Sequence, residues 1–294
     1  MRLLIPILVF ILTAPIALRA QLDPASLALR AYQSKDFEKA KELIDITIDD
    51  EMSSTRARTW VFRGYIYKDI YKLDQLSHDG REKRDESIRS YKRALELDTD
   101  GEFTNDCMES LRFLSTTIYN DAARSLEEGD FKPAVEYYEK YKELAKFRKP
   151  DLDFTGRDIE FKSFHASKLS LLHEKEQTNN LDSLSKEIVR LYEEVIALDS
   201  NDVQANYNLA IHYYNQGVHI IDNMDYELPF EELFLIQEKV MVLFQNALPY
   251  MLKAYMLTPG KSATLQGLSG IYFGLNDIEK SEFYQKKLEE LEGK

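Results

Sequence analysis

The stretch "YKRALELDTD" at residues 91–100 is echoed twice further along the chain, by "YEEVIALDSN" at 192–201 and by "MLKAYMLTPG" at 251–260. Each stretch begins with a large apolar residue, has a smaller apolar residue three positions later, then a leucine and then a polar turn. A segment that recurs with this pattern predicts a repeat protein, in which one supersecondary unit is copied along the chain.

The same region offers a second interpretation, because Glu96, Asp98 and Asp100 precede Gly101 as acidic ligands do in a calcium loop. Such a loop requires a bidentate glutamate six residues after its glycine. Cys107 occupies that position, so the strongest ligand is missing. We therefore interpret Asp98 and Gly101 as the end of a helix.

The N-terminus has the features of a secretory signal peptide. A charged start is followed by the apolar residues 3–18 and by "LRA" before Gln21. This arrangement predicts a signal at residues 1–20 that is cleaved after Ala20. An uncleaved membrane anchor is the alternative, although two prolines interrupt the run and it is short for a membrane span.

Cysteine usage agrees with an exported chain that is held together by packing alone. Cys107 is the single cysteine, so the expected cleavage site has no lipid-acceptor cysteine and no internal disulfide can form. We expect a soluble periplasmic or secreted protein, with Cys107 as a small buried apolar residue.

The charge balance is acidic, with 51 Asp and Glu against 38 Lys and Arg and a net charge of −13. Loss of residues 1–20 removes two arginines and no acid, which makes the mature chain more acidic still. An acidic surface repels nucleic acids and anionic membranes. We therefore expect neither a nucleic-acid partner nor stable membrane insertion after cleavage.

Helical periodicity runs through nearly all of the mature chain. An example is the series Leu181, Leu184, Ile188, Leu191, Val195 and Leu198. Alternating strand patterns are missing, and the few glycines and prolines lie mostly at expected turns. These observations predict an all-α fold.

Four segments carry a resemblance to a known family: "WVFRGYIY" (60–67), "EEGDFKPAVEYYEKY" (127–141), "NDVQANYNLAIHYYNQG" (201–217) and "GLNDIEKSEFYQKKLEEL" (274–291). They resemble tetratricopeptide (TPR) repeats of the exported type found in Bacteroidota. The resemblance implies a right-handed superhelical solenoid of antiparallel helix pairs over residues 21–294. The alignment gives six units, at 24–52, 57–100, 104–147, 158–200, 202–259 and 262–292.

The alignment also assigns positions within each unit. The central large residue of the second helix is Ile44, Tyr91, Tyr138, Tyr192, Met251 and Gln285 in turn. The spacing between these residues predicts extended helical hairpins in units two and five. In unit five we expect a turn at 223–228, Pro229 at a helix start and Pro249 inside the continuing helix.

The sequence contains no motif that indicates a metal, catalytic or cofactor site. His212 and His219 lie seven residues apart, too far for chelation from adjacent helical turns. The other histidines (His78, His165 and His173) form no ligand motif, and no nucleophile, phosphate-loop or dinucleotide motif occurs. We predict that the chain is not an enzyme and uses no cofactor or metal.

The resemblance implies binding of a protein or peptide on the concave face, through set positions of each first helix. Carried over, these positions are Arg58, Val61, Tyr65, Lys68, Thr116, Tyr119, Ala123, Leu126, Gln204, Tyr207, Ile211, Tyr214, Gln266 and Phe273. Family members that bind chaperones clamp a terminal carboxylate with lysine and asparagine in these positions, and that set is missing here. Alternatives are an accessory subunit of an envelope secretion or assembly machine, or a glycan-binding protein.

In unit five the sequence predicts two separate faces. Tyr207, Ile211 and Tyr214 are spaced i, i+4 and i+7, so they share one side of a helix. We expect this side to be a binding surface, and Leu209, Ala210 and Tyr213 to supply the core.

Overall fold

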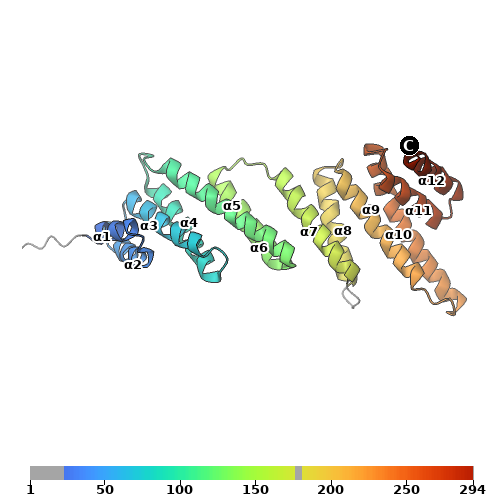
Figure 1. Ribbon diagram of the computed structural model, residues 1–294, viewed down its shortest axis with the longest axis horizontal. Helices are drawn as coiled ribbons and strands as arrows, with labels where there is room; N and C mark the ends of the chain where they lie inside the picture. Colours follow the sequence, from blue (N-terminus) through green and yellow to red (C-terminus); the bar gives the residue numbers. More distant parts are fainter. Residues whose placement is uncertain (1–22, 176–180, 294) are drawn as a thin grey trace, which may run out of the picture. The chain divides into compact units, whose positions relative to one another are not determined.

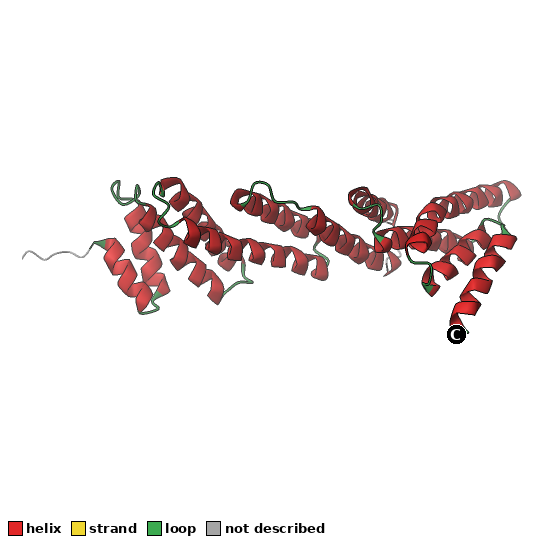
Figure 2. Cartoon of the chain, turned by 90° about the horizontal axis from the view of Figure 1, so that it is seen from above, coloured by secondary structure: helices red, strands yellow, loops and turns green. Residues whose placement is uncertain are grey.

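A computed structural model describes residues 23–175 and 181–293. These residues form twelve helices and no strand (Figures 1 and 2), which confirms the predicted all-α class. The expected signal peptide at 1–20 lies outside the described residues. Across the described part, every helix is too short or too polar to cross a bilayer.

The chain divides into two compact parts, with the boundary between Leu114 and Ser115 inside α5. They are called the first unit and the second unit below, and each is larger than the repeat units expected from the sequence. The first unit contains α1 (Pro24–Gln33), α2 (Phe37–Ile48), α3 (Ala57–Leu73), α4 (His78–Leu97) and the start of α5 (Thr104–Glu128). The second contains the rest of α5, α6 (Phe131–Arg148), α7 (Thr155–Lys175), α8 (Leu181–Leu198), α9 (Val203–Asp222), α10 (Phe230–Leu257), α11 (Ser262–Gly274) and α12 (Ile278–Glu292).

The three echoing stretches of sequence all end a helix at the same position. Helix α4 ends at Leu97, α8 at Leu198 and α10 at Leu257, in each case the leucine of the repeated pattern. The large residue that begins each stretch is buried, and so is the smaller residue three positions later. The recurrence therefore reflects one structural role, the packed last turns of a second helix.

Asp98 is the C-cap residue of α4, and its side chain also binds the start of α5. Its Oδ2 accepts hydrogen bonds from the backbone N of Phe103, at 3.0 Å, and from the hydroxyl of Thr104, at 2.8 Å. Gly101 has φ +74°, a left-handed conformation that suits glycine, and Glu96 pairs with Arg93 at 2.7 Å. The expected helix end is confirmed, and the chain turns directly into α5.

Three of the turns inside helix pairs share one geometry. Lys35, Gly129 and Asn276 have φ of 62°, 83° and 63°, and an aspartate follows each of them. The backbone N of that aspartate donates to a carbonyl five residues back, as Asp277 does to Tyr272 at 2.9 Å. This hydrogen bond ends the first helix. The same aspartate is the N-cap of the next helix. An aspartate therefore takes part both in ending the first helix and in starting the second.

The core runs between helices that are neighbours in the sequence. Helix α1 packs on α2, α3 on α4, α7 on α8, α9 on α10 and α11 on α12, and Figure 1 shows α9 and α10 side by side. Ile44, Tyr91, Tyr138, Tyr192 and Met251 are buried, as expected of central residues. Gln285 is exposed, so the sixth assignment is wrong at this position.

Helices α9 and α10 form a hairpin around the turn expected at 223–228. Helix α9 ends at Asp222, Pro229 precedes the first residue of α10, and Pro249 lies inside that helix. Helix α10 has 28 residues, and its first turns carry several exposed apolar side chains. This hairpin contributes to both surfaces described below.

Candidate functional site

The predicted binding residues of the first unit lie at α3, facing the start of α5. Arg58 pairs with Glu102 at 3.2 Å, and the Tyr65 hydroxyl donates to Asp106 at 3.2 Å. The Lys68 ammonium donates to Ser110 Oγ at 2.9 Å and lies 4.6 Å from the Tyr65 ring centroid. These three side chains therefore form one polar seam, in which each already has a partner.

In the second unit the predicted residues are distributed over α5, α9 and α11. The Tyr119 ring packs beside another aromatic ring, since the centroids of the Tyr119 and Tyr141 rings are 5.2 Å apart. The Arg157 guanidinium lies 4.9 Å from the centroid of the Tyr119 ring. Gln204, Gln266 and Phe273 are exposed, as is Thr116 in α5, and Ala123 is half-buried.

Two of the predicted residues lie in the core. Val61 is 4% exposed and Leu126 is 0% exposed. Helix α3 is flanked by α2 and α4, and Leu126 belongs to a cluster with Tyr138 and Phe161. Neither side chain presents a surface to a partner, because helices cover these positions from more than one side.

The expected separation of two faces on α9 is also corrected. Leu209 and Ala210 are buried as expected, but Tyr207, Ile211, Tyr213 and Tyr214 are all half-buried against the core around Phe244 and Met251. The Tyr214 ring lies against Gly270, where an added Cβ would be 2.5 Å from its hydroxyl. Tyr214 is therefore a packing residue, since α10 and α11 both contact α9.

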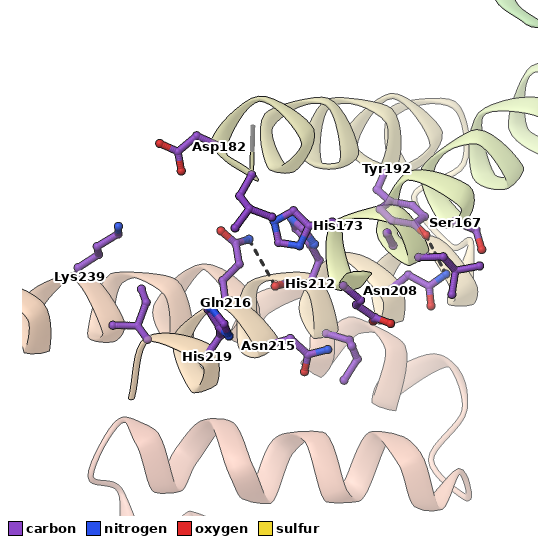
Figure 3. Close-up of a pocket in the computed structure, with 16 residues that line it drawn as sticks. Ser167, His173, Asp182, Tyr192, Asn208, His212, Asn215, Gln216, His219 and Lys239 are labelled. Carbon is purple, nitrogen blue, oxygen red and sulfur yellow. Dashed lines mark hydrogen bonds between the residues drawn. The ribbon is translucent and has the colours of Figure 1, made fainter. Parts of the chain in front are cut away.

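A cavity of about 570 Å³ lies in the second unit, beside the face of α9 that includes Ile211 (Figure 3). Helix α7 contributes Ser167, Ser170 and His173, α8 contributes Asp182 and Tyr192, and α10 contributes Lys239. In Figure 3 Asp182 and Lys239 lie at one edge and Ser167 and Asn208 at the other. The volume is within the range of ligand-binding pockets, about 300–1,000 Å³.

Helix α9 provides the cavity with a row of amide side chains. Asn208, Ile211 and Asn215 lie three and four residues apart on one face, with Gln216 beside them. Asn208 donates to the Tyr192 hydroxyl at 3.1 Å and accepts from Gln204 at 2.7 Å. Asn215 is exposed and has no hydrogen-bond partner among the described residues. Its amide can both donate and accept, as a peptide backbone requires.

Two histidines meet in this cavity from different helices. The His173 and His212 rings have centroids 5.3 Å apart, and Figure 3 shows them side by side. Burial, with a smaller contribution from His173, lowers the pKa of His212 to about 4. Burial also lowers the pKa of His173. Both imidazoles are therefore neutral at pH 7 and can offer one donor and one acceptor each.

The pKa of the buried His212 does not suit a catalytic base. His212 Nε2 lies 3.0 Å from Ser185 Oγ, as in a serine–histidine dyad. A general base works best with a pKa near the operating pH, whereas the pKa of His212 is lowered to about 4. Over the described residues, no group of three histidine, cysteine or acidic side chains is placed to hold a metal ion.

Sequence reasoning included Ile211 and Gln204 among the candidates but missed Asn208, Asn215, His173 and His212. His173 and His212 come from α7 and α9, and no spacing rule relates residues so far apart. The one sequence signal for this cavity was the i, i+7 spacing of Asn208 and Asn215, which places two polar amide side chains on one side of a helix.

Comparison with known proteins gives a faint structural likeness. No protein-family model matches the sequence, and no curated protein matches it. A structure titled "Crystal structure of MamA protein" matches at 19% identity with a TM-score of 0.35, over 79% of this chain and 92% of that chain. A second, "Crystal structure of MamA", has the same identity and TM-score over 72% of this chain and 91% of that chain.

Proposed function

We propose that this chain is an exported, non-enzymatic scaffold that binds an extended segment of another protein in the cavity between α7, α8 and α9. The observation that carries the proposal is the row of Asn208, Ile211 and Asn215 along one face of α9. Two amides flank an apolar residue there, and Asn215 is free to bond a ligand.

The chemistry of the lining favours a peptide backbone over a charged ligand. An extended peptide presents a donor and an acceptor at nearly every residue, and these need partners when they leave water. Asparagine amides, serine hydroxyls and neutral histidines offer both kinds of partner. Asp182 and Lys239 lie at one edge, and apart from these two and Glu174 the lining residues carry no charge at pH 7.

We further propose that the helix pairs are TPR-like units of a right-handed superhelix, with longer hairpins in units two and five. The helix ends at Leu97, Leu198 and Leu257, and the shared turn geometry at Lys35, Gly129 and Asn276, support this proposal. The apolar run at 3–18 supports export. The unit boundaries at 24–52, 57–100, 104–147, 158–200, 202–259 and 262–292 remain part of the proposal.

The test uses the mature chain, residues 21–294, and a displayed library of short random peptides. Enriched peptides are synthesised, and their affinity is measured by fluorescence polarisation. We expect Asn215→Leu to weaken binding about tenfold, because buried peptide groups lose their partner. Asn246→Leu is the matched control, since Asn246 is an exposed helical asparagine outside the cavity.

Equal affinity of the Asn215→Leu variant and the wild type would contradict the assignment of the cavity. Failure to enrich any peptide would contradict peptide binding itself. Circular dichroism of both variants checks that the fold is retained, and an exposed substitution is expected to change stability by less than about 0.5 kcal/mol.

A further inference from the structure

A second hollow is lined by the α9–α10 hairpin and the end of α11, and it shares no lining residue with the cavity described above. Its volume is about 330 Å³, and its walls come from the end of α9, the α9–α10 turn, the first three turns of α10 and the end of α11. Gln237 and Asn276 are its only lining residues with amide side chains among those described. The hollow is therefore mainly apolar, with the Tyr226 hydroxyl as a further polar group.

The apolar side chains around this hollow are unusually exposed. Phe230 is 78% exposed, Tyr226 72% and Phe234 52%. Phe230, Phe234 and Met241 lie at i, i+4 and i+11, so they form one stripe along α10. Exposed aromatic side chains gathered at one place are a feature of interaction sites, and methionine adapts readily to a partner's shape.

Acidic residues flank the stripe. Asp222 ends α9, Asp225 and Glu227 lie in the turn, and Glu231 and Glu238 follow the stripe along α10. All five are exposed, and none forms an ion pair within the described part of the chain. Between Ile220 and Met251 the single lysine or arginine is Lys239, which lines the other cavity. The hollow thus has an apolar floor and a negative rim.

We propose that this surface binds a basic amphipathic helix of another protein. An extended strand would leave backbone groups without partners against walls that offer few polar side chains, whereas a helix satisfies its own backbone. The stripe from Phe230 to Met241 spans roughly 16 Å along α10, about three turns of a partner helix. Lysine or arginine beside the partner's apolar face meets the acidic rim.

The negative charge of the surface favours a cationic helix over a second copy of this chain or an anionic membrane. A second copy of this chain would bring its own acidic surface, since the net charge is −13, and an anionic membrane would be repelled in the same way. A cationic helix is the occupant for which both the apolar floor and the rim are favourable. Attraction of this kind weakens as salt is added.

The test titrates the mature chain with a synthetic helix of about 18 residues that carries leucine at i, i+4, i+7 and i+11 and lysine elsewhere. Binding is followed by calorimetry, and helix formation in the peptide by circular dichroism. We expect the peptide to bind as a helix, and a peptide with glutamate in place of lysine to bind at least about tenfold more weakly.

Matched variants make the test specific to the surface. Phe230→Ala with Phe234→Ala should weaken binding about tenfold or more, and Glu231→Lys with Glu238→Lys should do the same through the rim. Met256→Ala with Phe283→Ala is the control, because these exposed apolar residues lie near the end of α10 and on α12 and do not line the hollow. The control should bind as the wild type does.

Three results would overturn the proposal. The first is equal loss of affinity in the control and in the Phe230/Phe234 variant. The second is binding without a gain of peptide helicity. The third is occupation of the surface by something else, seen as a dimer in sedimentation or as co-sedimentation with phosphatidylglycerol vesicles, either of which disappears in the Phe230/Phe234 variant.

Discussion

The ring of Phe244 on α10 lies directly against the backbone of Gly217 on α9. A Cβ added to Gly217 would be 2.7 Å from Cε1 of this ring, closer than side-chain atoms normally approach. Phe244 is buried, so its ring has little room to move. The two helices therefore approach this closely because residue 217 has no side chain.

Replacement of this glycine should destabilise the second unit. Alanine favours a helix over glycine by roughly 0.5–1 kcal/mol, but overpacking against a buried ring costs about 1–3 kcal/mol. We expect Gly217→Ala to lower the free energy of unfolding by about 1–2 kcal/mol in urea denaturation. Gly156→Ala is the control, since nothing lies within 4 Å of its Cβ position in α7, and it should be neutral or stabilising.

Arg63 and Arg58 lie on the same helix but should differ sharply in their contribution to stability. Arg63 is buried and donates to Asp45 at 2.9 Å, to Glu86 at 3.1 Å and to Ser90 at 2.7 Å. Loss of one partner from a buried pair costs roughly 3–5 kcal/mol. Asp45 and Glu86 are partly exposed, so we expect about 2–3 kcal/mol for Arg63→Met.

The comparison variant is Arg58→Met. Arg58 and Glu102 are both exposed, and exposed ion pairs contribute about 0–1 kcal/mol. Thermal melting followed by circular dichroism compares the two variants. A similar fall in melting temperature for both would show that the Arg63 network does not stabilise the first unit as the contacts indicate.

Stability should fall on mild acidification. Burial lowers the pKa of His212 to about 4 from 6.5 and shifts His165 and His173 in the same direction. The unfolded chain therefore binds protons at these residues before the folded chain does. The free energy of unfolding should decrease as pH falls from about 6.5 to about 4, with about 3 kcal/mol from His212 over the full range.

The measurement is urea denaturation at a series of pH values. Aspartates and glutamates begin to titrate at the acidic end of the same range, so a His212→Gln variant separates their contribution. This variant should show a shallower decrease between pH 6.5 and 5. An unchanged slope would mean that His212 titrates normally in the folded chain.

Cys107 should be almost unreactive in the folded protein. Its side chain is fully buried in the first unit, and burial, together with Asp98 and Asp106, raises the pKa of the thiol to about 12. The thiolate is the reacting form. We expect Ellman's reagent to react at least about a hundredfold more slowly with the native chain than with the chain in urea. A native rate equal to the denatured rate would contradict this burial.

The periodic features of the fold were accessible from sequence. The helix ends at Leu97, Leu198 and Leu257 follow from a local pattern in which large, small and polar residues occupy set positions. The turn at 223–228 likewise follows from proline and from the interruption of apolar spacing. Such features depend on residues within a few positions of one another, which is what a pattern records.

The cavity was not predictable in the same way. Its histidine pair joins α7 to α9, and the spacing of His173 and His212 reflects the lengths of the intervening helices rather than a motif. The assignments of Val61 and Leu126 to a surface were carried over from the TPR resemblance, and they were wrong because a family position identifies a side of a helix but not how many neighbours cover it. Tyr214 is half-buried for the same reason, against α10 and α11.

The pairing of helices with their sequence neighbours has a kinetic consequence. The extensive contacts join helices that are adjacent in the chain, so each hairpin closes only a short loop and loses little chain entropy before it gains contacts. Chains dominated by such local contacts fold rapidly. Because synthesis proceeds from the N-terminus, α1 and α2 can close on each other before α11 and α12 have been made.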